Sequence, residues 1–220
     1  MTITLLFLAV LMGVVLWWLF RQTVNAQPWV AHAAATDVHP GALAHPAAKT
    51  ALGVFLAVAT SLFALFISAY AMRMHFGDWQ PLPEPGLLWW NSGVLVATSI
   101  AMQATVSAAR RGDGVALRKR LLIGGVLTCV FLVGQLMAWR QLNAAGYYLG
   151  NNPANGFVYL LTAGHAVHVL GGLVAWGRTT LRLGRGEDVA RLRLGVELCA
   201  TYWHFLLIVW FVLFGLLLMT

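Results

Sequence analysis

The sequence predicts an all-α membrane protein: a six-transmembrane-helix bundle with both chain termini in the periplasm. Two observations indicate this fold class. Of the 220 residues, 60% are hydrophobic and only 10% are charged, whereas a soluble domain carries about 25% charged residues. The chain also contains six apolar runs, each close to the ~20 residues that a helix needs to cross the hydrocarbon core.

The six runs lie at 3–20, 52–72, 88–108, 121–139, 157–176 and 198–219. All seven prolines fall between the runs, as expected for helices whose backbone must satisfy its own hydrogen bonds in lipid. The runs are continuous, whereas the strands of a membrane barrel would alternate apolar and polar residues. The first run is expected to be an uncleaved anchor, because it lacks a basic leading region and ends in Trp17, Trp18 and Phe20 rather than in small residues.

The basic residues predict the orientation. Twelve of the 14 Lys and Arg residues flank the runs on one side, and only Arg73 and Arg140 lie on the other. Because basic residues mark cytoplasmic loops, both termini are predicted to be periplasmic. We therefore expect an N-terminal transmembrane helix at 1–21, a cytoplasmic linker at 22–50 and a five-helix core at 51–220, in a bacterial inner membrane.

Composition and side-chain placement argue against several functions. The net charge of +7 does not indicate a nucleic-acid partner, because the bases lie in short loops between apolar runs. Cys129 and Cys199 lie inside runs and form no CxxC pair, so neither a disulfide nor a metal site is expected. Of the seven acids only Glu197 adjoins a run, at the start of the last one. Proton relays need ionisable groups at membrane depth, so neither a proton path nor a catalytic site is expected in this chain alone.

Three histidines, His165, His168 and His204, lie inside the runs. His165 and His168 are three residues apart and therefore share a helix face. His168 and His204 could reach a comparable depth and ligate a b-type haem. Alternatively, the histidines bond to each other or to polar neighbours, since buried polar side chains need partners. The candidate neighbours are Thr162, Tyr202 and Glu197. With one cross-helix histidine pair and no second pair, hydrogen bonding is the favoured interpretation.

A stripe of small residues recurs every four positions along the third run. Its members are Gly93, Ala97, Ala101, Thr105 and Ala109. Such a stripe allows another helix to approach closely, so we expect a helix-packing seam. The seam could face a partner subunit or another helix of the same bundle, and the second interpretation is favoured.

Two motifs near the C-terminus resemble those of cytochrome c oxidase subunit III. Residues 162–172, Thr-Ala-Gly-His-Ala-Val-His-Val-Leu-Gly-Gly, resemble the family's TGxHxxHVxxG. The sequence Tyr-Trp-His-Phe at 202–205, followed by Trp210, resembles YWHFxxxxW in the family's last helix. Glu197 stands where the family has an acid at the start of this helix. Weaker similarities extend the resemblance over residues 50–220.

The resemblance implies an accessory, non-catalytic subunit of a proton-pumping haem–copper terminal oxidase in the aerobic respiratory chain. Such a subunit holds no haem or copper itself; partner subunits I and II, of which subunit I is catalytic, hold them. It binds phospholipid in a cleft between its helix groups and supports proton uptake and the durability of the complex. The residues implied for lipid or structural polar contacts are His165, His168, Glu197, Tyr202, Trp203, His204 and Trp210.

The chain departs from the family at three positions where acids are common, which hold Ala59, Ala138 and Leu207. These departures argue against a proton-handling role. They also leave open an alternative function with the same fold, that of the accessory subunit of a nitric oxide reductase. A b-type haem electron carrier that uses His168 and His204 is an alternative from another class. A transporter is disfavoured, because the runs lack proline and no inverted repeat is evident.

Overall fold

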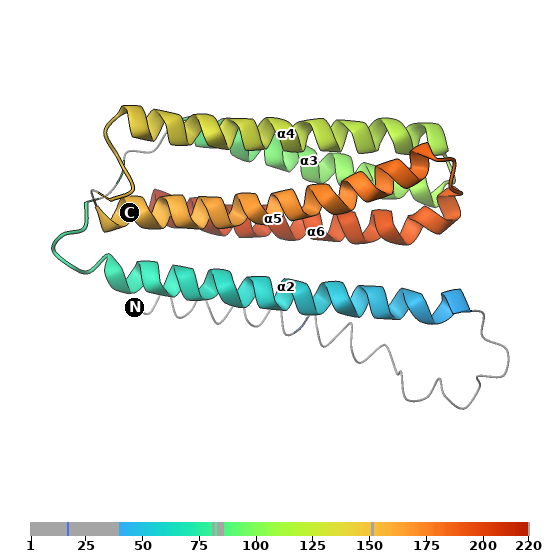
Figure 1. The fold of residues 1–220 in the computed structure, drawn as a ribbon, viewed down its shortest axis with the longest axis horizontal. Helices are drawn as coiled ribbons and strands as arrows, with labels where there is room; N and C mark the ends of the chain where they lie inside the picture. The colour runs from blue at the N-terminus through green and yellow to red at the C-terminus, as the bar shows by residue number, and fades with distance from the viewer. Residues whose placement is uncertain (1–16, 18–39, 81, 83–85, 151, 220) are drawn as a thin grey trace. The chain divides into compact units, whose positions relative to one another are not determined.

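The computed structural model describes residue 17 and residues 40–80, 82, 86–150 and 152–219. The elements in this part of the chain are five helices, α2 (Pro40–Arg73), α3 (Leu87–Arg110), α4 (Gly114–Ala144), α5 (Pro153–Gly184) and α6 (Val189–Leu218) (Figure 1). All five are long and apolar enough to cross a membrane, counted from Ala47 in α2. The predicted all-α membrane class is therefore confirmed. Apart from Trp17, the run at 3–20 lies outside the described residues, so the sixth helix and the periplasmic termini remain predictions.

The helix boundaries differ from the apolar runs. The linker predicted at 22–50 overlaps α2, which already begins at Pro40; proline is tolerated in a first helical turn because its missing N–H would be unpaired there anyway. Similarly, α4 begins at Gly114 rather than at 121, and α5 continues to Gly184 rather than ending at 176. Hydropathy marks only the lipid-crossing part of a helix, whereas capping residues decide where the helix ends.

The described residues divide into two units, one that contains α2 up to Ala71 and one that begins at Met72. The second unit contains α3 to α6, which run side by side as a four-helix bundle (Figure 1). In it α3 packs against α4 and α6, and α5 packs against the same two helices. The core of this unit is mostly apolar, with Leu95, Leu117, Phe131, Leu161 and Leu206 each at 0% exposure. Van der Waals packing of this kind is a main source of helix association in lipid.

Two tight turns close one end of the bundle, and both use a glycine followed by an aspartate. After α3, Gly112 adopts a left-handed φ of 71°, a conformation that residues with a Cβ rarely take. Asp113 then caps α4 by accepting a hydrogen bond of 2.9 Å from the N–H of Ala116. After α5, Gly186 (φ 81°) and the N-cap Asp188 of α6 repeat the arrangement. These turns fix α3 against α4 and α5 against α6.

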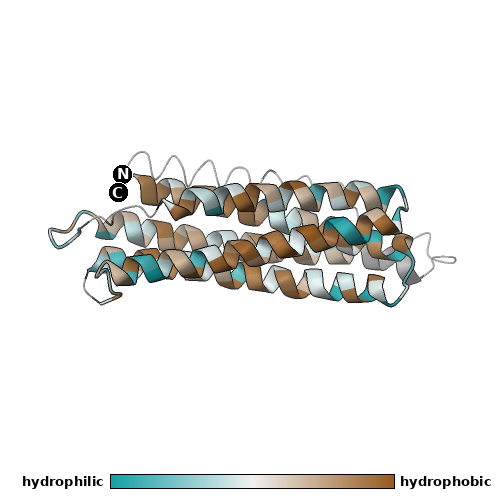
Figure 2. Ribbon diagram, turned by 90° about the horizontal axis from the view of Figure 1, so that it is seen from above, coloured by the Kyte–Doolittle hydropathy of each residue, from teal (hydrophilic) through white to brown (hydrophobic). Residues whose placement is uncertain are grey.

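The same end of the bundle carries most of its positive charge. Hydrophobic residues dominate the middle of the helices, and hydrophilic residues gather toward their ends (Figure 2). The last turn of α3, the first turns of α4 and α6 and the last turns of α5 meet at this end. Their bases are Arg110, Arg111, Arg118, Lys119, Arg120, Arg178, Arg182, Arg185, Arg191 and Arg193. At the opposite end the second unit has only Arg73 and Arg140. The charge asymmetry read from the sequence thus runs along the bundle axis.

Candidate functional site

The motif on α6 connects this helix to its neighbours through consecutive side chains. The hydroxyl of Tyr202 donates a 2.9 Å hydrogen bond to the backbone carbonyl of His168 on α5. The indole Nε1 of Trp203 donates a 3.1 Å hydrogen bond to Oγ1 of Thr128 on α4. Successive residues of an α-helix point about 100° apart, so adjacent motif positions reach different helices. Trp203 and Thr128 are both at 0% exposure, which makes this contact part of the core.

The next motif residues on α6 reach α3. The ring of His204 lies between two side chains of that helix, with Nδ1 at hydrogen-bond distance of Ser99 Oγ and Nε2 3.0 Å from Gln103 Oε1. Further along α6, the indole of the fully buried Trp210 donates a 2.8 Å hydrogen bond to Ser92 Oγ. All four polar motif side chains of α6 therefore bond to another helix of the same bundle.

The first motif histidine on α5 is completely enclosed. His165 is at 0% exposure, and its Nε2 lies 3.0 Å from the backbone carbonyl of Leu206 on α6. The rings of Phe131 on α4 and Trp210 on α6 approach it with centroids 5.7 and 5.1 Å away. The imidazole therefore packs among α4, α5 and α6 and makes its hydrogen bond inside the core.

The partners of the motif side chains differ in part from those predicted. Nδ1 of His168 bonds to the carbonyl of Gly164 in its own helix at 2.7 Å. Thr162 Oγ1 instead accepts a 3.0 Å hydrogen bond from the indole of Trp139. Both ring nitrogens of His204 lie against α3 side chains. This arrangement gives no support to a haem held between His168 and His204.

A glycine of the α5 motif allows α6 to approach closely. A methyl group added to Gly172 would lie 2.9 Å from Cε1 of Tyr202 and 3.1 Å from Cη2 of Trp203. Both distances are below ordinary carbon–carbon contact. The motif glycine therefore provides the space that the aromatic residues of the α6 motif occupy.

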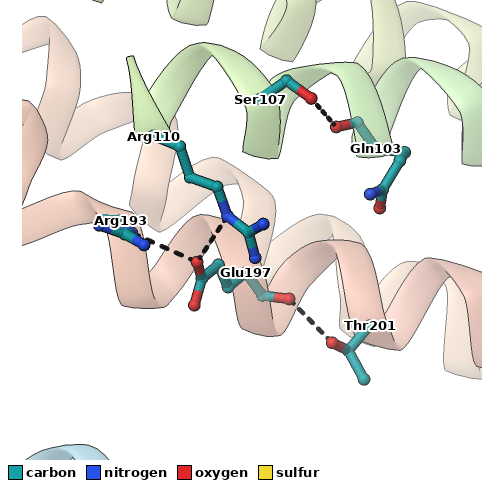
Figure 3. A network of polar contacts seen from close by, with 6 residues as sticks. All are labelled: Gln103, Ser107, Arg110, Arg193, Glu197 and Thr201. Atoms are coloured by element: carbon teal, nitrogen blue, oxygen red, sulfur yellow. Dashed lines mark hydrogen bonds and ion pairs between the residues drawn. The ribbon is translucent and has the colours of Figure 1, made fainter. Parts of the chain in front are cut away.

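Glu197 forms a charged link between α3 and α6 at the basic end of the bundle. Its Oε1 accepts from Arg110 of α3 at 3.2 Å and from Arg193, one turn earlier on α6, at 3.3 Å (Figure 3). The glutamate side chain is 23% exposed and the two arginine side chains are more than half exposed. Exposed ion pairs are screened by solvent and typically contribute little, so Glu197 orients two guanidinium groups more than it stabilises the fold.

Two further ion pairs lie at the ends of helices. Arg73 pairs with Asp78 after α2, and Arg182 pairs with Glu187 in the turn before α6. In each case the hydrogen bond from the guanidinium holds the pKa of the carboxyl below its ordinary value. Both carboxylates therefore stay charged at neutral pH in turns that connect helices.

The predicted packing seam faces outward in its first half. Gly93 and Ala97 are exposed and Ala101 is partly exposed, and no heavy atom of a neighbouring residue lies within 4 Å of a methyl group added to Gly93. The face of α3 that packs in the bundle instead includes Leu95, Thr98 and Met102. A seam at Gly93, Ala97 and Ala101 thus remains a prediction, and the exposure of Gly93 and Ala97 is more compatible with a partner subunit than with another helix of the same bundle.

The positions at which the family's acids are missing differ in burial. Ala59 and Ala138 are 3% and 1% exposed, and Leu207 is partly exposed on α6. Among the described residues, no group of three or more His, Cys, Asp and Glu side chains lies close enough to hold a metal ion. The hydrogen bonds of the motif side chains can hold the helices together, and the arginines at the basic end of the bundle can present positive charge at a membrane surface.

Most partners of the motif were not predicted. Ser92, Thr128 and Ser99 receive or share the hydrogen bonds of the α6 motif. Ser92 and Thr128 also donate to carbonyls in their own helices, Leu88 and Gly124, as hydroxyls in apolar helices commonly do. The only signal in the sequence was their location inside an apolar run, which does not identify a partner.

The fold and the site define a class: a polytopic helical membrane protein whose polar motif residues brace its own helices. The family model for cytochrome c oxidase subunit III matches residues 3–219. Probable cytochrome c oxidase subunit 3 of Mycobacterium tuberculosis (strain H37Rv) is 33% identical over 156 residues, which cover 70% of this chain and 76% of the relative. Cytochrome c oxidase subunit 3 of Synechocystis sp. is 31% identical over 167 residues, 73% of this chain and 70% of the relative. Cytochrome c oxidase subunit 3 of Corynebacterium diphtheriae is 29% identical over 157 residues, which cover 70% of this chain and 76% of the relative.

The chain belongs to the cytochrome c oxidase subunit III family, membrane proteins of the respiratory chain. The resemblance read from the two motifs is confirmed, and the match reaches beyond the predicted core into residues 3–49. The relatives named above are bacterial.

Proposed function

We propose that this chain is the accessory, non-catalytic subunit III of a haem–copper terminal oxidase in a bacterial inner membrane. It stabilises catalytic subunit I, together with subunit II, and binds phospholipid. It holds no haem or copper of its own; those groups belong to the partner subunits. The observation that carries this proposal is that the polar motif side chains of α6 are used in hydrogen bonds to α3, α4 and α5.

Catalysis would require polar groups directed at a reacting atom or arranged along a proton path. Here Trp203 and Trp210 are buried with their indole N–H groups bonded to Thr128 and Ser92. Such bonds hold helices in one arrangement, each contributing about 0.6 kcal/mol on average and up to ~1.7 in a membrane protein. A rigid bundle of this kind suits a subunit whose role is to support its neighbours.

The outer surface of the bundle supports a lipid partner. The exposed side chains of α4 and α5 are large and apolar, among them Val126, Val130, Val133, Val167 and Leu170. At the basic end, Arg110 and Arg193 present guanidinium groups that are more than half exposed. Guanidinium groups pair well with phosphate oxygens, and apolar helix faces accommodate acyl chains. Phospholipid headgroups at this end are therefore part of the proposal.

The charge asymmetry supports the orientation. Ten bases of the second unit lie at the end formed by the α3–α4 and α5–α6 turns, and basic loops are retained in the cytoplasm. We therefore assign these turns to the cytoplasmic side, which puts the end of α6 in the periplasm.

A pair of tyrosine variants tests the supporting role. Tyr202→Phe removes only the hydroxyl that bonds to His168, whereas Tyr148→Phe makes the same change at a residue that is 56% exposed. In the purified complex, Tyr202→Phe should lower the temperature at which subunit III is lost, and Tyr148→Phe should not. The initial oxygen-reduction rate per haem should be unchanged in both, because neither residue takes part in the reaction. A lower initial rate in Tyr202→Phe complexes that still retain the subunit would contradict the proposal.

Mass spectrometry of the same preparations tests the lipid partner. Phospholipid should remain with complexes that contain the subunit and decrease in complexes from which it has been lost. Equal lipid content in both would remove lipid binding from the proposal. Purification of a nitric oxide reductase with this chain would instead establish the rival assignment.

A further inference from the structure

Two buried polar atoms in the motif core have no hydrogen-bond partner among the described residues of the chain. They are Oε1 of Gln135 on α4 and Nδ1 of His165 on α5. Gln135 is 2% exposed and His165 is 0% exposed. Buried polar atoms in proteins are almost always paired with protein or with ordered water, so each of these two atoms requires a hydrogen-bond partner.

The two atoms belong to side chains at the same level of the α4–α5 interface. Phe131, one turn before Gln135 on α4, packs its ring against His165 at a centroid distance of 5.7 Å. Trp139, one turn after Gln135, donates to Thr162, one turn before His165 on α5. Residues four apart on a helix share a face. Gln135 therefore lies between two contacts that both lead to the face of α5 that carries His165.

The hydrogen-bond partners of His165 determine what kind of donor is needed. A backbone carbonyl only accepts, so Nε2 of His165 carries the hydrogen that it donates to Leu206. In the neutral imidazole the other nitrogen, Nδ1, is then an acceptor. The carbonyl oxygen of the Gln135 amide is an acceptor too. Two acceptors cannot bond to each other, but one molecule with two donor hydrogens satisfies both.

We propose that a buried water molecule is bound between α4 and α5, donating one hydrogen to Nδ1 of His165 and the other to Oε1 of Gln135. Buried waters commonly make two to four hydrogen bonds to otherwise unpaired polar groups. With the bond to Leu206, this water connects α4, α5 and α6 through a single neutral imidazole. The first histidine of the α5 motif thus binds a structural water.

A density map of the whole oxidase complex, at a resolution of about 2 Å, tests the proposal. The expected result is an isolated peak about 2.7–3.2 Å from both Nδ1 of His165 and Oε1 of Gln135. Direct contact of the two side chains without an intervening peak would overturn it. A peak closer than about 2.5 Å to both oxygen and nitrogen would indicate a bound cation and would also overturn it.

A variant and a matched control extend the test. Gln135→Met keeps the length of the side chain but removes the acceptor, so the peak should disappear while the bond from His165 to Leu206 remains. Asn155, on α5 about 15 Å along the helix from His165, also has a buried unpaired oxygen, and Asn155→Ala should leave the peak in place. Persistence of the peak in Gln135→Met, or its loss in Asn155→Ala, would contradict the assigned partners. The wild-type map alone remains decisive if a variant fails to assemble.

Discussion

Adjacent glycines on α5 offer a matched pair of substitutions that probes the contact between the two motifs. Gly172 is buried against α6, where an added methyl group would meet Tyr202 and Trp203. Gly171 is exposed, and a methyl group there would meet nothing within 4 Å. Alanine at either position gains the same helix propensity, about 0.8–1.0 kcal/mol relative to glycine. The difference between the two variants therefore isolates the packing contact.

The size of that difference follows from the distances. Carbon atoms pack best at about 3.5–4.0 Å, so contacts of 2.9 and 3.1 Å require shifts of about half an ångström. Trp203 is fully buried and hydrogen-bonded to Thr128, which leaves its ring little room to move. Overpacking of this kind typically costs about 1–3 kcal/mol. We expect Gly172→Ala to be less stable than Gly171→Ala by this amount, or roughly 2–12 °C in melting temperature for a unit of about 150 residues.

The purified complex is heated, and the fraction of this subunit that remains bound and helical is measured at each temperature. Gly171→Ala should be equal to the wild type or slightly more stable, and Gly172→Ala clearly less stable. Equal melting temperatures for the two variants would show that α6 does not approach α5 closely at Gly172. A larger loss in Gly171→Ala would place an unseen partner on the outer face of α5 and refute the reasoning from burial.

Three further predictions concern orientation, cofactor content and labelling. A reporter fused after Thr220 should be periplasmic and one inserted in the turn at 111–113 cytoplasmic, because the bases cluster at that end; the reverse pattern would overturn the topology. The isolated chain should give no haem in a pyridine-haemochrome assay, and one haem per chain that is lost in His204→Ala would favour the electron carrier. A hydrophobic carbodiimide, which reacts with neutral carboxyls reached from lipid, should leave the subunit unlabelled, since Ala59 and Ala138 replace the buried acids and Glu197 is ion-paired. Mass spectrometry showing a stoichiometric adduct on Glu197 would reopen the case for proton handling.

The membrane class and five of the helices could be predicted because a span is defined by the composition of about 20 consecutive residues. The ends of the helices could not be predicted in the same way. Asp113 and Asp188 cap α4 and α6, which begin at Gly114 and Val189, well before the apolar runs at 121 and 198. A glycine followed within two residues by aspartate, between two long helices, was the signal that would have located both turns.

The candidate site was predicted as a set of residues but not as a set of contacts. The two motifs identified His165, Tyr202 and Trp203, which the structure brings together around one face of α5. Their partners Thr128 and Ser92 come from other helices, and the pairing depends on how the helices are rotated in the bundle. Rotation is set by packing across the whole interface, which no local stretch of sequence encodes.

The oxidase complex prepared with and without this subunit provides the most direct test of the supporting role. The two quantities to measure are the initial rate of oxygen reduction per haem and the half-life of that rate during continuous turnover. We predict that removal of the subunit leaves the haem spectrum and the initial rate close to those of the intact complex and shortens the half-life severalfold. An unchanged half-life, or an initial rate near zero in a complex with an intact haem spectrum, would contradict the assignment of this chain as a supporting subunit.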